Sequence, residues 1–380
     1  MRVIPRDWFV FHTGCMIPES RFVYVLLAGC LGAAVLSGQS APSGELLVLS
    51  KADQTLAIVN PATLKVLWRV PSGPDPHEVI ASADGKTAYI SNYGGGAYNT
   101  ISVVDLVEHK ALSAIDLDAL HGPHGLAFAG GKLWFTAESN KVIGSYDPAA
   151  KKVDWVLGTG QNRTHMIYVF DDLKRMITSN VSSATMTFIE KSAGGGGRGA
   201  GPGGPPPPGR GPGPGRGGPP PGRGPGGSPQ GDWDETVVAV GRGAEGFDVS
   251  PDGKELWAAN AQDGTISVVD VAARKVTQTL AANVTGANRL KFTLDGKLVF
   301  VSTLSGPDLM ILDAATRREV KRVKIGTGAA GILMQPDGAR VFVGCTPDDY
   351  VAIIDMKTLD VAGHLDAGRQ PDGLAWAVRR

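Results

Sequence analysis

Three histidines draw attention because their spacing is nearly regular. His77, His124 and His165 each precede a short apolar run, and they are 47 and 41 residues apart. A neutral imidazole is both a metal ligand and a hydrogen-bonding group. If the fold gathers these side chains, they can hold a divalent transition metal or contact a polar ligand. Whether they meet depends on the elements that carry them.

Similar segments of about 42 residues recur along the chain. Units that start at Gly246, Arg289 and Gly331 begin 43 and 42 residues apart. Each unit contains four short apolar-alternating runs separated by turn residues, which is the pattern of four antiparallel strands. The repeat therefore predicts the fold more strongly than any single motif does.

Earlier copies of the unit are weaker but keep the same spacing. They start at Glu78, Gly125 and Met166. The stretch 45–70 supplies three strands and 372–377 supplies one, so the two ends together complete a seventh unit. Four-stranded units of this length are typical of a β-propeller.

We therefore expect an all-β fold, a seven-bladed β-propeller of four-stranded blades spanning residues 44–377. The C-terminal strand is expected to pair with the N-terminal strands and close the ring, which removes an open sheet edge. The pattern SPDGKELWAAN…TISVVD resembles the YVTN-type (YncE-like) repeat of exported bacterial proteins. That resemblance implies a periplasmic or surface propeller of varied role, and no catalytic motif comes with it.

One position recurs in front of the first strand of every unit, where a propeller has the mouth of its central channel. Around the ring this position is occupied by His77, His124, His165, Glu245, Asn288, Ala330 and Asp372. The chain has only seven histidines. Three of them in one repeated position are not expected from composition alone.

Three interpretations of this arc are open. In the first, a small anionic ligand, a peptide or a protein partner binds at the mouth. Its contacts would include the polar residues of the arc together with Arg163, Arg289 and Arg369. In the second, the arc is the metal centre of a lyase, lactonase or oxidoreductase. Its ligands would be His77, His124, His165 and Glu245. In the third, these residues line a solvated channel and bond to loop backbone.

Three further columns of residues follow from the repeat. Residues that end the third strand are expected to cap the following turn; they are Asp105, Asp147, Glu190, Asp270, Asp313, Asp355 and Asn60. Aromatic residues of the second strand are expected in the core; they are Tyr89, Phe135, Trp257, Phe300 and Phe342. Residues that end the second strand are candidates for an outer polar ring; they are Asn92, Glu138, Asn180, Asn260, Thr303 and Cys345. Cys345 is expected to be accessible but not activated.

Residues 1–40 have the order of a secretory signal peptide. Arg21 precedes the apolar run 22–36, and small and polar residues follow it. The run contains LAGC, which is similar to a bacterial lipobox, and attachment to a membrane is expected only if Cys30 is lipidated. Cleavage near residue 40 is the favoured interpretation. The protein is thus predicted to be periplasmic or extracellular.

Residues 192–231 are an insertion of glycine, proline and arginine in the fourth unit. Little of this segment can be buried, so it is predicted to be disordered with extended proline-rich patches. Its arginines suit anionic surface polymers, which makes a cell-surface scaffold an alternative function. An inert expansion in a tolerant loop is the simpler explanation.

The chain carries 37 basic and 37 acidic side chains, which gives no electrostatic argument for a nucleic-acid partner. It has no GxSxG, HExxH or P-loop motif. We therefore predict an exported, monomeric binding module for a small ligand, a peptide or a protein partner. The metal-dependent enzyme, with a divalent transition metal as cofactor, and the surface scaffold are the alternatives.

Overall fold

The computed structural model describes residues 44–192 and 233–378. The predicted signal peptide at 1–40, with Cys30, lies outside these residues, and so does all but the first residue of the insertion at 192–231. Among the described residues, no helix is long and apolar enough to cross a membrane. The helical elements in this part of the chain are three short 3₁₀ turns, η1 (Gly94–Gly96), η2 (Glu138–Asn140) and η3 (Thr346–Asp348).

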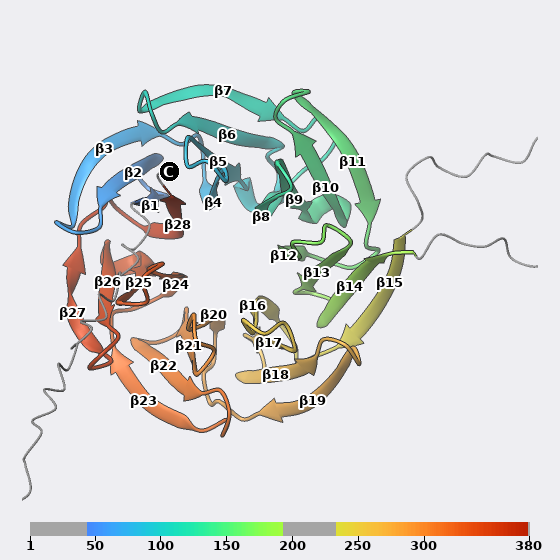
Figure 1. Ribbon diagram of the computed structural model, residues 1–380, viewed down its shortest axis with the longest axis vertical. Helices are drawn as coiled ribbons and strands as arrows, with labels where there is room; N and C mark the ends of the chain where they lie inside the picture. Colours follow the sequence, from blue (N-terminus) through green and yellow to red (C-terminus); the bar gives the residue numbers. More distant parts are fainter. Residues whose placement is uncertain (1–43, 193–232, 379–380) are drawn as a thin grey trace, which may run out of the picture. The chain divides into compact units, whose positions relative to one another are not determined.

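The described residues form seven four-stranded antiparallel sheets arranged as blades around a central axis (Figure 1). The first blade consists, from the axis outward, of β28 (Pro371–Val378), β1 (Gly44–Ser50), β2 (Thr55–Asn60) and β3 (Lys65–Pro71). The second consists of β4 (Pro76–Ala81), β5 (Thr87–Asn92), β6 (Thr100–Asp105) and β7 (Lys110–Asp116). The third consists of β8 (Pro123–Ala129), β9 (Lys132–Ala137), β10 (Val142–Asp147) and β11 (Lys152–Gly158).

The remaining four blades follow in chain order. The fourth consists of β12 (Thr164–Val169), β13 (Arg175–Asn180), β14 (Thr185–Lys191) and β15 (Trp233–Ala239). The fifth consists of β16 (Ala244–Val249), β17 (Glu255–Asn260), β18 (Thr265–Asp270) and β19 (Lys275–Leu280). The sixth consists of β20 (Ala287–Phe292), β21 (Leu298–Thr303), β22 (Asp308–Asp313) and β23 (Glu319–Lys324). The seventh consists of β24 (Ala329–Met334), β25 (Arg340–Cys345), β26 (Tyr350–Asp355) and β27 (Asp360–Leu365).

The two ends of the described chain share one blade. β28 pairs antiparallel with β1 in a register that runs from Gly44 opposite Val378 to Ser50 opposite Pro371. The ring therefore has no open edge strand at the junction. The predicted seven-bladed propeller and its closure by the C-terminal strand are confirmed.

The blades pack through aromatic and aliphatic side chains, as the second-strand column predicted. Phe135, Trp257, Phe300 and Phe342 are fully buried and Tyr89 nearly so. The Trp257 ring meets Phe292 of the next blade edge to face at 5.5 Å. Such contacts hold neighbouring blades together through apolar burial.

Residues that end the third strand cap turns, as predicted for Asp and Asn. The Asp105 carboxylate accepts hydrogen bonds from the backbone N–H groups of Val107 and Glu108, both at 2.9 Å. The same type of contact is made by Asn60, Asp147, Asp270, Asp313 and Asp355. Glu190 departs from the pattern and forms an ion pair with Arg274.

A bulge near the start of each innermost strand creates the position that carries the histidines. In the second blade Pro76 pairs with Asn92 and Val79 with Ile90, so the two residues between them fall outside the ladder. The same register shift recurs in the other six blades. The first residue of this pair is called the mouth slot below. It is the second residue of the strand, not the residue before the strand as the sequence indicated.

Candidate metal centre at the channel mouth

The seven mouth-slot residues border one cavity of about 360 Å³. They are His77, His124, His165, Glu245, Asn288, Ala330 and Asp372. Arg163 and Arg289 line the same cavity, so eight of the nine residues proposed as ligand contacts meet there. Arg369 does not line it. Its guanidinium is two-thirds exposed and pairs with Asp53 at 2.7 Å.

A second set of lining residues was missed from the sequence. They directly follow the second strand of a blade, and those in the cavity wall are Lys51, Tyr93, Leu304 and Thr346. Glu138 holds the same position in the third blade, because Ala137 is the last residue of β9 and pairs with Val142. The sequence had aligned Glu138 with Asn92, one residue out of register. Counting from the paired strand ends would have revealed this column.

The predicted outer polar ring is wrong, because its asparagines serve their own blades. The side-chain amide of Asn92 donates to the hydroxyls of Thr100 and Ser102 at 3.0 and 2.9 Å. Asn180 and Asn260 donate to third-strand hydroxyls in the same way. Only Glu138, which belongs to the other column, reaches the histidines.

Cys345 is fully buried, which contradicts the expected accessibility. Its thiol lies 3.5 Å from the carbonyl oxygen of Ile325. Burial raises the pKa of Cys345 to about 12. The thiol is therefore inert at neutral pH and takes no part in the site.

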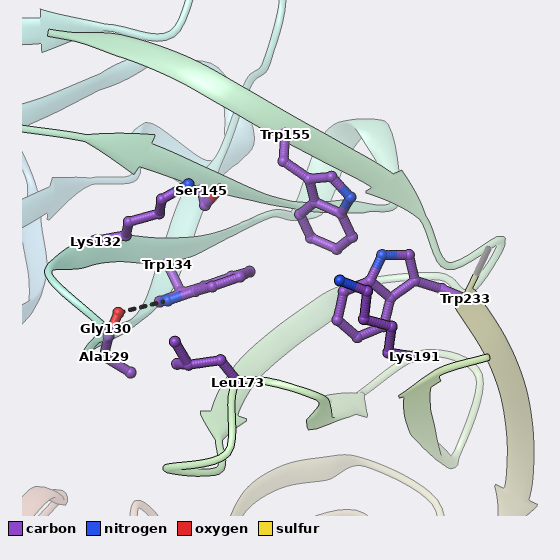
Figure 2. Close-up of a pocket in the computed structure, with 9 residues that line it drawn as sticks. All are labelled: Ala129, Gly130, Lys132, Trp134, Ser145, Trp155, Leu173, Lys191 and Trp233. Atoms are coloured by element: carbon purple, nitrogen blue, oxygen red, sulfur yellow. Dashed lines mark hydrogen bonds between the residues drawn. The ribbon is translucent and has the colours of Figure 1, made fainter. Parts of the chain in front are cut away.

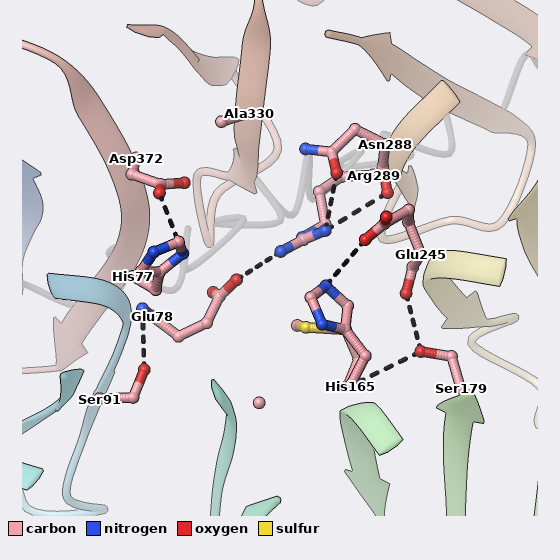
Figure 3. A network of polar contacts seen from close by, with 12 residues as sticks. His77, Glu78, Ser91, His165, Ser179, Glu245, Asn288, Arg289, Ala330 and Asp372 are labelled. Carbon is pink, nitrogen blue, oxygen red and sulfur yellow. Dashed lines mark hydrogen bonds and ion pairs between the residues drawn. The ribbon is translucent and has the colours of Figure 1, made fainter. Parts of the chain in front are cut away.

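His165 is held between two carboxylates. Its Nδ1 contacts Oε1 of Glu138. Its Nε2 lies 3.0 Å from Oε2 of Glu245 (Figure 3). Burial by itself would lower the pKa of His165, but hydrogen bonds and charge from the two glutamates outweigh it and raise the pKa. Contact with His165 in turn lowers the pKa of Glu245 to about 2, against the effect of burial. Both ring nitrogens of His165 therefore point at anionic oxygen.

His124 has no such partner. Its side chain is 3% exposed, and its Nδ1 is buried without a hydrogen bond among the described residues. The ring lies against His165 with a centroid distance of 3.8 Å, and against Tyr93 at 5.1 Å. Burial, followed by the charges of His165 and His77, holds the pKa of His124 well below its usual range. The ring is therefore neutral and carries a buried nitrogen that nothing satisfies.

His77 is occupied by its neighbours. The Lys51 ammonium donates to Nε2 of His77 at 2.7 Å. The Nδ1 of His77 lies 3.6 Å from Asp372 (Figure 3). Burial lowers the pKa of His77. A metal ion could use Nε2 only after Lys51 had moved, so His77 borders the centre without offering a free nitrogen.

Glu138 is the junction of the buried network. Tyr93 donates its hydroxyl hydrogen to Oε2 of Glu138 at 2.6 Å, and the Arg163 guanidinium lies 3.4 Å from the same oxygen. Burial raises the pKa of Glu138, but hydrogen bonding to His165 and the other contacts lower it overall. Glu138 is thus a buried carboxylate at neutral pH.

An ion pair spans the ring beside these residues. Arg289 of β20 meets Glu78 of β4 at 2.7 Å, and its guanidinium also bonds to Oδ1 of Asn288 at 3.0 Å (Figure 3). Glu78 and Arg289 each directly follow a mouth-slot residue.

In four other blades this second bulge position is glycine, and at Gly125 a Cβ would come within 2.5 Å of the His165 carbonyl oxygen. The residue after His124 must therefore be glycine for the blades to approach.

The fixed charges of the mouth are internally paired. Lys51 lies 3.5 Å from Asp75 and 3.3 Å from Asp372. The other two cations of the cavity wall are also paired with carboxylates, Arg163 with Glu138 and Glu245, and Arg289 with Glu78. Five carboxylates thus face three permanent cations. An added cation fits this balance better than an added anion does.

Three of these residues form a group that can hold a metal ion. Ligand atoms of His124, Glu138 and His165 all lie within 4.8 Å of one another, and the three side chains are buried. Tetrahedral ligation places ligand atoms about 3.4 Å apart, so a small convergence of side chains would complete the geometry. Two nitrogens and one carboxylate oxygen suit zinc, iron or copper. Two of the four ligands proposed from the sequence are in this group, and Glu138 is the addition.

Solved structures share the fold with this chain. A protein of unknown function from Desulfotomaculum acetoxidans aligns with a TM-score of 0.65 and 12% identity, covering 88% of this chain and 99% of its own. Hydrazine synthase from Kuenenia stuttgartiensis gives a TM-score of 0.60 at 15% identity, covering 80% and 90%. A dihydro-heme d1 dehydrogenase gives 0.58 at 14% identity, covering 89% and 76%. At these identities the likeness shows the propeller fold alone.

No model of a protein family and no curated protein sequence matches the chain. The likeness to YVTN-type repeats is therefore a resemblance of the repeat. The propeller itself rests on the seven sheets and on the structural neighbours.

Proposed function

We propose that the channel mouth binds one divalent transition-metal ion through His124, His165 and Glu138. The buried, unpartnered Nδ1 of His124 carries this proposal. A buried polar atom without a partner costs about 1–3 kcal/mol, and a metal ion removes that cost. The adjacent carboxylate and second imidazole supply the rest of a ligand set.

The residues around this group supply the outer support that metal ligands need. A ligating histidine is normally oriented by a carboxylate on its other ring nitrogen. His165 has Glu138 on one nitrogen and Glu245 on the other, so one glutamate ligates while the other orients the ring. The Tyr93 hydroxyl fixes the second oxygen of Glu138.

A metal held by three protein ligands would keep an open position. Two of the three proposed ligands, His124 and His165, line the cavity of about 360 Å³, which would give a small molecule access to the ion. An ion in this setting would polarise a carbonyl oxygen or activate water at neutral pH. The proposed function is therefore Lewis-acid chemistry on a small oxygen-bearing molecule. Permanent anions are disfavoured as ligands, because every cation of the cavity wall already has a carboxylate partner.

Metal content tests the proposal directly. The purified full chain, dialysed against zinc, iron or copper near neutral pH, is expected to retain one ion per molecule by mass spectrometry. Cobalt substitution should give visible bands that change in Glu138→Gln. His364→Ala, which removes an exposed histidine from β27, is the matched control and should bind like the parent. Metal content far below one per chain, or equal cobalt spectra for Glu138→Gln and the parent, would refute the site.

We further propose that the protein acts outside the cytoplasm, because residues 1–40 have the order of a secretory signal peptide. N-terminal sequencing of the protein recovered from the periplasm or medium tests this. A start near residue 41 supports ordinary cleavage. A blocked, lipid-modified Cys30 supports membrane attachment, and an uncleaved N-terminal segment in the cytoplasm refutes export.

A further inference from the structure

A second cavity lies apart from the mouth, between the third and fourth blades. It measures about 340 Å³ and is bordered by the β8–β9 turn at Gly130 and the β12–β13 turn at Leu173. Three tryptophans form its wall, Trp134 of β9, Trp155 of β11 and Trp233 of β15 (Figure 2). This set is called the tryptophan groove below.

The rings of the groove are arranged for stacking. Trp134 and Trp155 meet edge to face at 5.7 Å, and Trp155 and Trp233 are tilted at 5.3 Å. Trp134 is buried and forms the floor, whereas Trp155 and Trp233 are partly exposed. Leu173 is 37% exposed and forms an apolar edge (Figure 2). Two large aromatic surfaces are therefore open to a ligand.

The groove offers two indole N–H donors that have no partner in the described part of the chain. The Trp134 indole N–H donates to the carbonyl oxygen of Ala129 at 3.1 Å. Neither Trp155 nor Trp233 has an indole partner among the described residues. A ligand for this surface should therefore bring carbonyl acceptors and flat apolar rings. Proline-rich chains have both, since proline has a ring and a carbonyl but no N–H, and they bind aromatic grooves in this way.

The charges of the groove do not call for an ionic ligand. Lys132 pairs with Asp154, and the Ser145 hydroxyl donates to the same carboxylate at 2.6 Å. Lys191 is exposed at the rim. Stacking and hydrogen bonding to carbonyl groups, and not charge pairing, are therefore the interactions left to the ligand.

The groove lies at the two strand ends that flank residues 193–232, and this position indicates what occupies it. Lys191 and Trp233 face each other in the β14–β15 register, and both line the groove. The chain therefore leaves and re-enters the sheet here, with residues 193–232 between. That segment contains proline runs at 205–208 and 219–221. About a dozen residues separate each run from the nearer strand end, and such a tether spans up to roughly 40 Å, which is ample to fold back.

We propose that the tryptophan groove docks the proline runs of this chain's own segment 193–232. Proline rings lie on Trp155 and Trp233, whose indole N–H groups donate to the preceding carbonyls. Each run is followed by Gly-Arg, at Arg210 and Arg223, and guanidinium groups stack on tryptophan faces. Tethering gives an effective concentration in the millimolar range, so weak intrinsic affinity suffices. This site is independent of the proposed metal centre.

Fluorine NMR of the full chain tests the docking. The seven tryptophans are labelled with 5-fluorotryptophan, and the Trp155 and Trp233 resonances are assigned with Trp155→Phe and Trp233→Phe. Replacing the seven prolines of the two runs by serine is expected to shift these two resonances. Trp68, on the outer strand β3 of the first blade, and Trp257 should not move. A matched variant that replaces Arg198, Arg210, Arg216 and Arg223 by serine separates the arginine contribution.

The proline variants change nothing in the propeller, so a failure to fold cannot imitate the result. A synthetic peptide of residues 203–224 should restore the parent resonances when added to the proline-free variant. Identical Trp155 and Trp233 resonances in the parent and proline-free chains would overturn the proposal. Resonances that depend on protein concentration would overturn it in favour of a second copy. A shift produced only by a cell-wall oligosaccharide would overturn it in favour of a carbohydrate.

Discussion

The mouth slot is built in the same way in all seven blades, yet its chemistry differs between two arcs. The second to fifth blades place His77, His124, His165 and Glu245 in it. The seventh blade places Ala330 there, at 5% exposure, in a strand with the same bulge. A methyl group therefore satisfies the fold as well as an imidazole does. The histidines are not needed to build a blade, and their presence requires a chemical explanation.

At the second bulge position, by contrast, the packing of the blades restricts which residue can be present. In four blades it is glycine, as at Gly125 and Gly331, and a side chain there would strike the neighbouring backbone. Where it is Glu78 or Arg289, the two side chains meet across the ring. That pair ties distant blades together with all its charges satisfied. The histidine arc, by contrast, leaves the buried Nδ1 of His124 without a partner among the described residues.

The largest expected effect is on metal binding in His124→Ala. Losing one of three ligands should abolish stoichiometric binding, with affinity reduced by more than about 100-fold. Because the slot already accepts Ala330, the variant should fold, and its circular dichroism spectrum should match the parent. Mass spectrometry after dialysis measures the metal, and His364→Ala is the control. Unchanged metal content in His124→Ala would remove His124 from the ligand set.

The next effect is on stability, through the pair that spans the ring. Glu78→Ala leaves the largely buried Arg289 guanidinium without its carboxylate, and the free energy of unfolding should fall by about 2–3 kcal/mol. The double variant Glu78→Ala/Arg289→Ala should recover part of that loss, because no unpaired charge remains. Denaturant titration of the metal-free chain measures both. A double variant less stable than Glu78→Ala alone would show that the cost arises from lost packing.

A smaller effect is expected from Glu245→Gln, which keeps the shape of the side chain but removes its charge. If Glu245 orients His165 without ligating, affinity for the metal should fall by about 10–100-fold with stoichiometry unchanged. Isothermal titration of the metal-free chain gives both quantities. A complete loss of binding would instead make Glu245 a ligand and Glu138 the orienting residue.

The sequence predicted the ring and the slot because both follow from the periodicity of the repeat. That periodicity can be recognised at single positions such as His77 and Asp372. It failed on Glu138 because register depends on strand pairing. The connection after β9 has four residues and that after β5 has seven, so the strand ends could not be aligned by eye. The contact between Glu78 and Arg289 was also out of reach. It joins residues 211 apart through the curvature of the ring, which no local pattern encodes.

The smallest expected effect comes from introducing a histidine into the mouth slot of the seventh blade, outside the histidine arc. In Ala330→His the new imidazole would face the same cavity, so the cost in stability should be about 1 kcal/mol, at the low end for an enlarged buried side chain. The residues that follow the second strand on this side are Leu304 and Thr346, where the histidine arc has Tyr93 and Glu138. Without a buried carboxylate and a second neutral imidazole, it should bind no additional metal. Titration should therefore still give one ion per chain, and two ions would show that the slot alone makes the site.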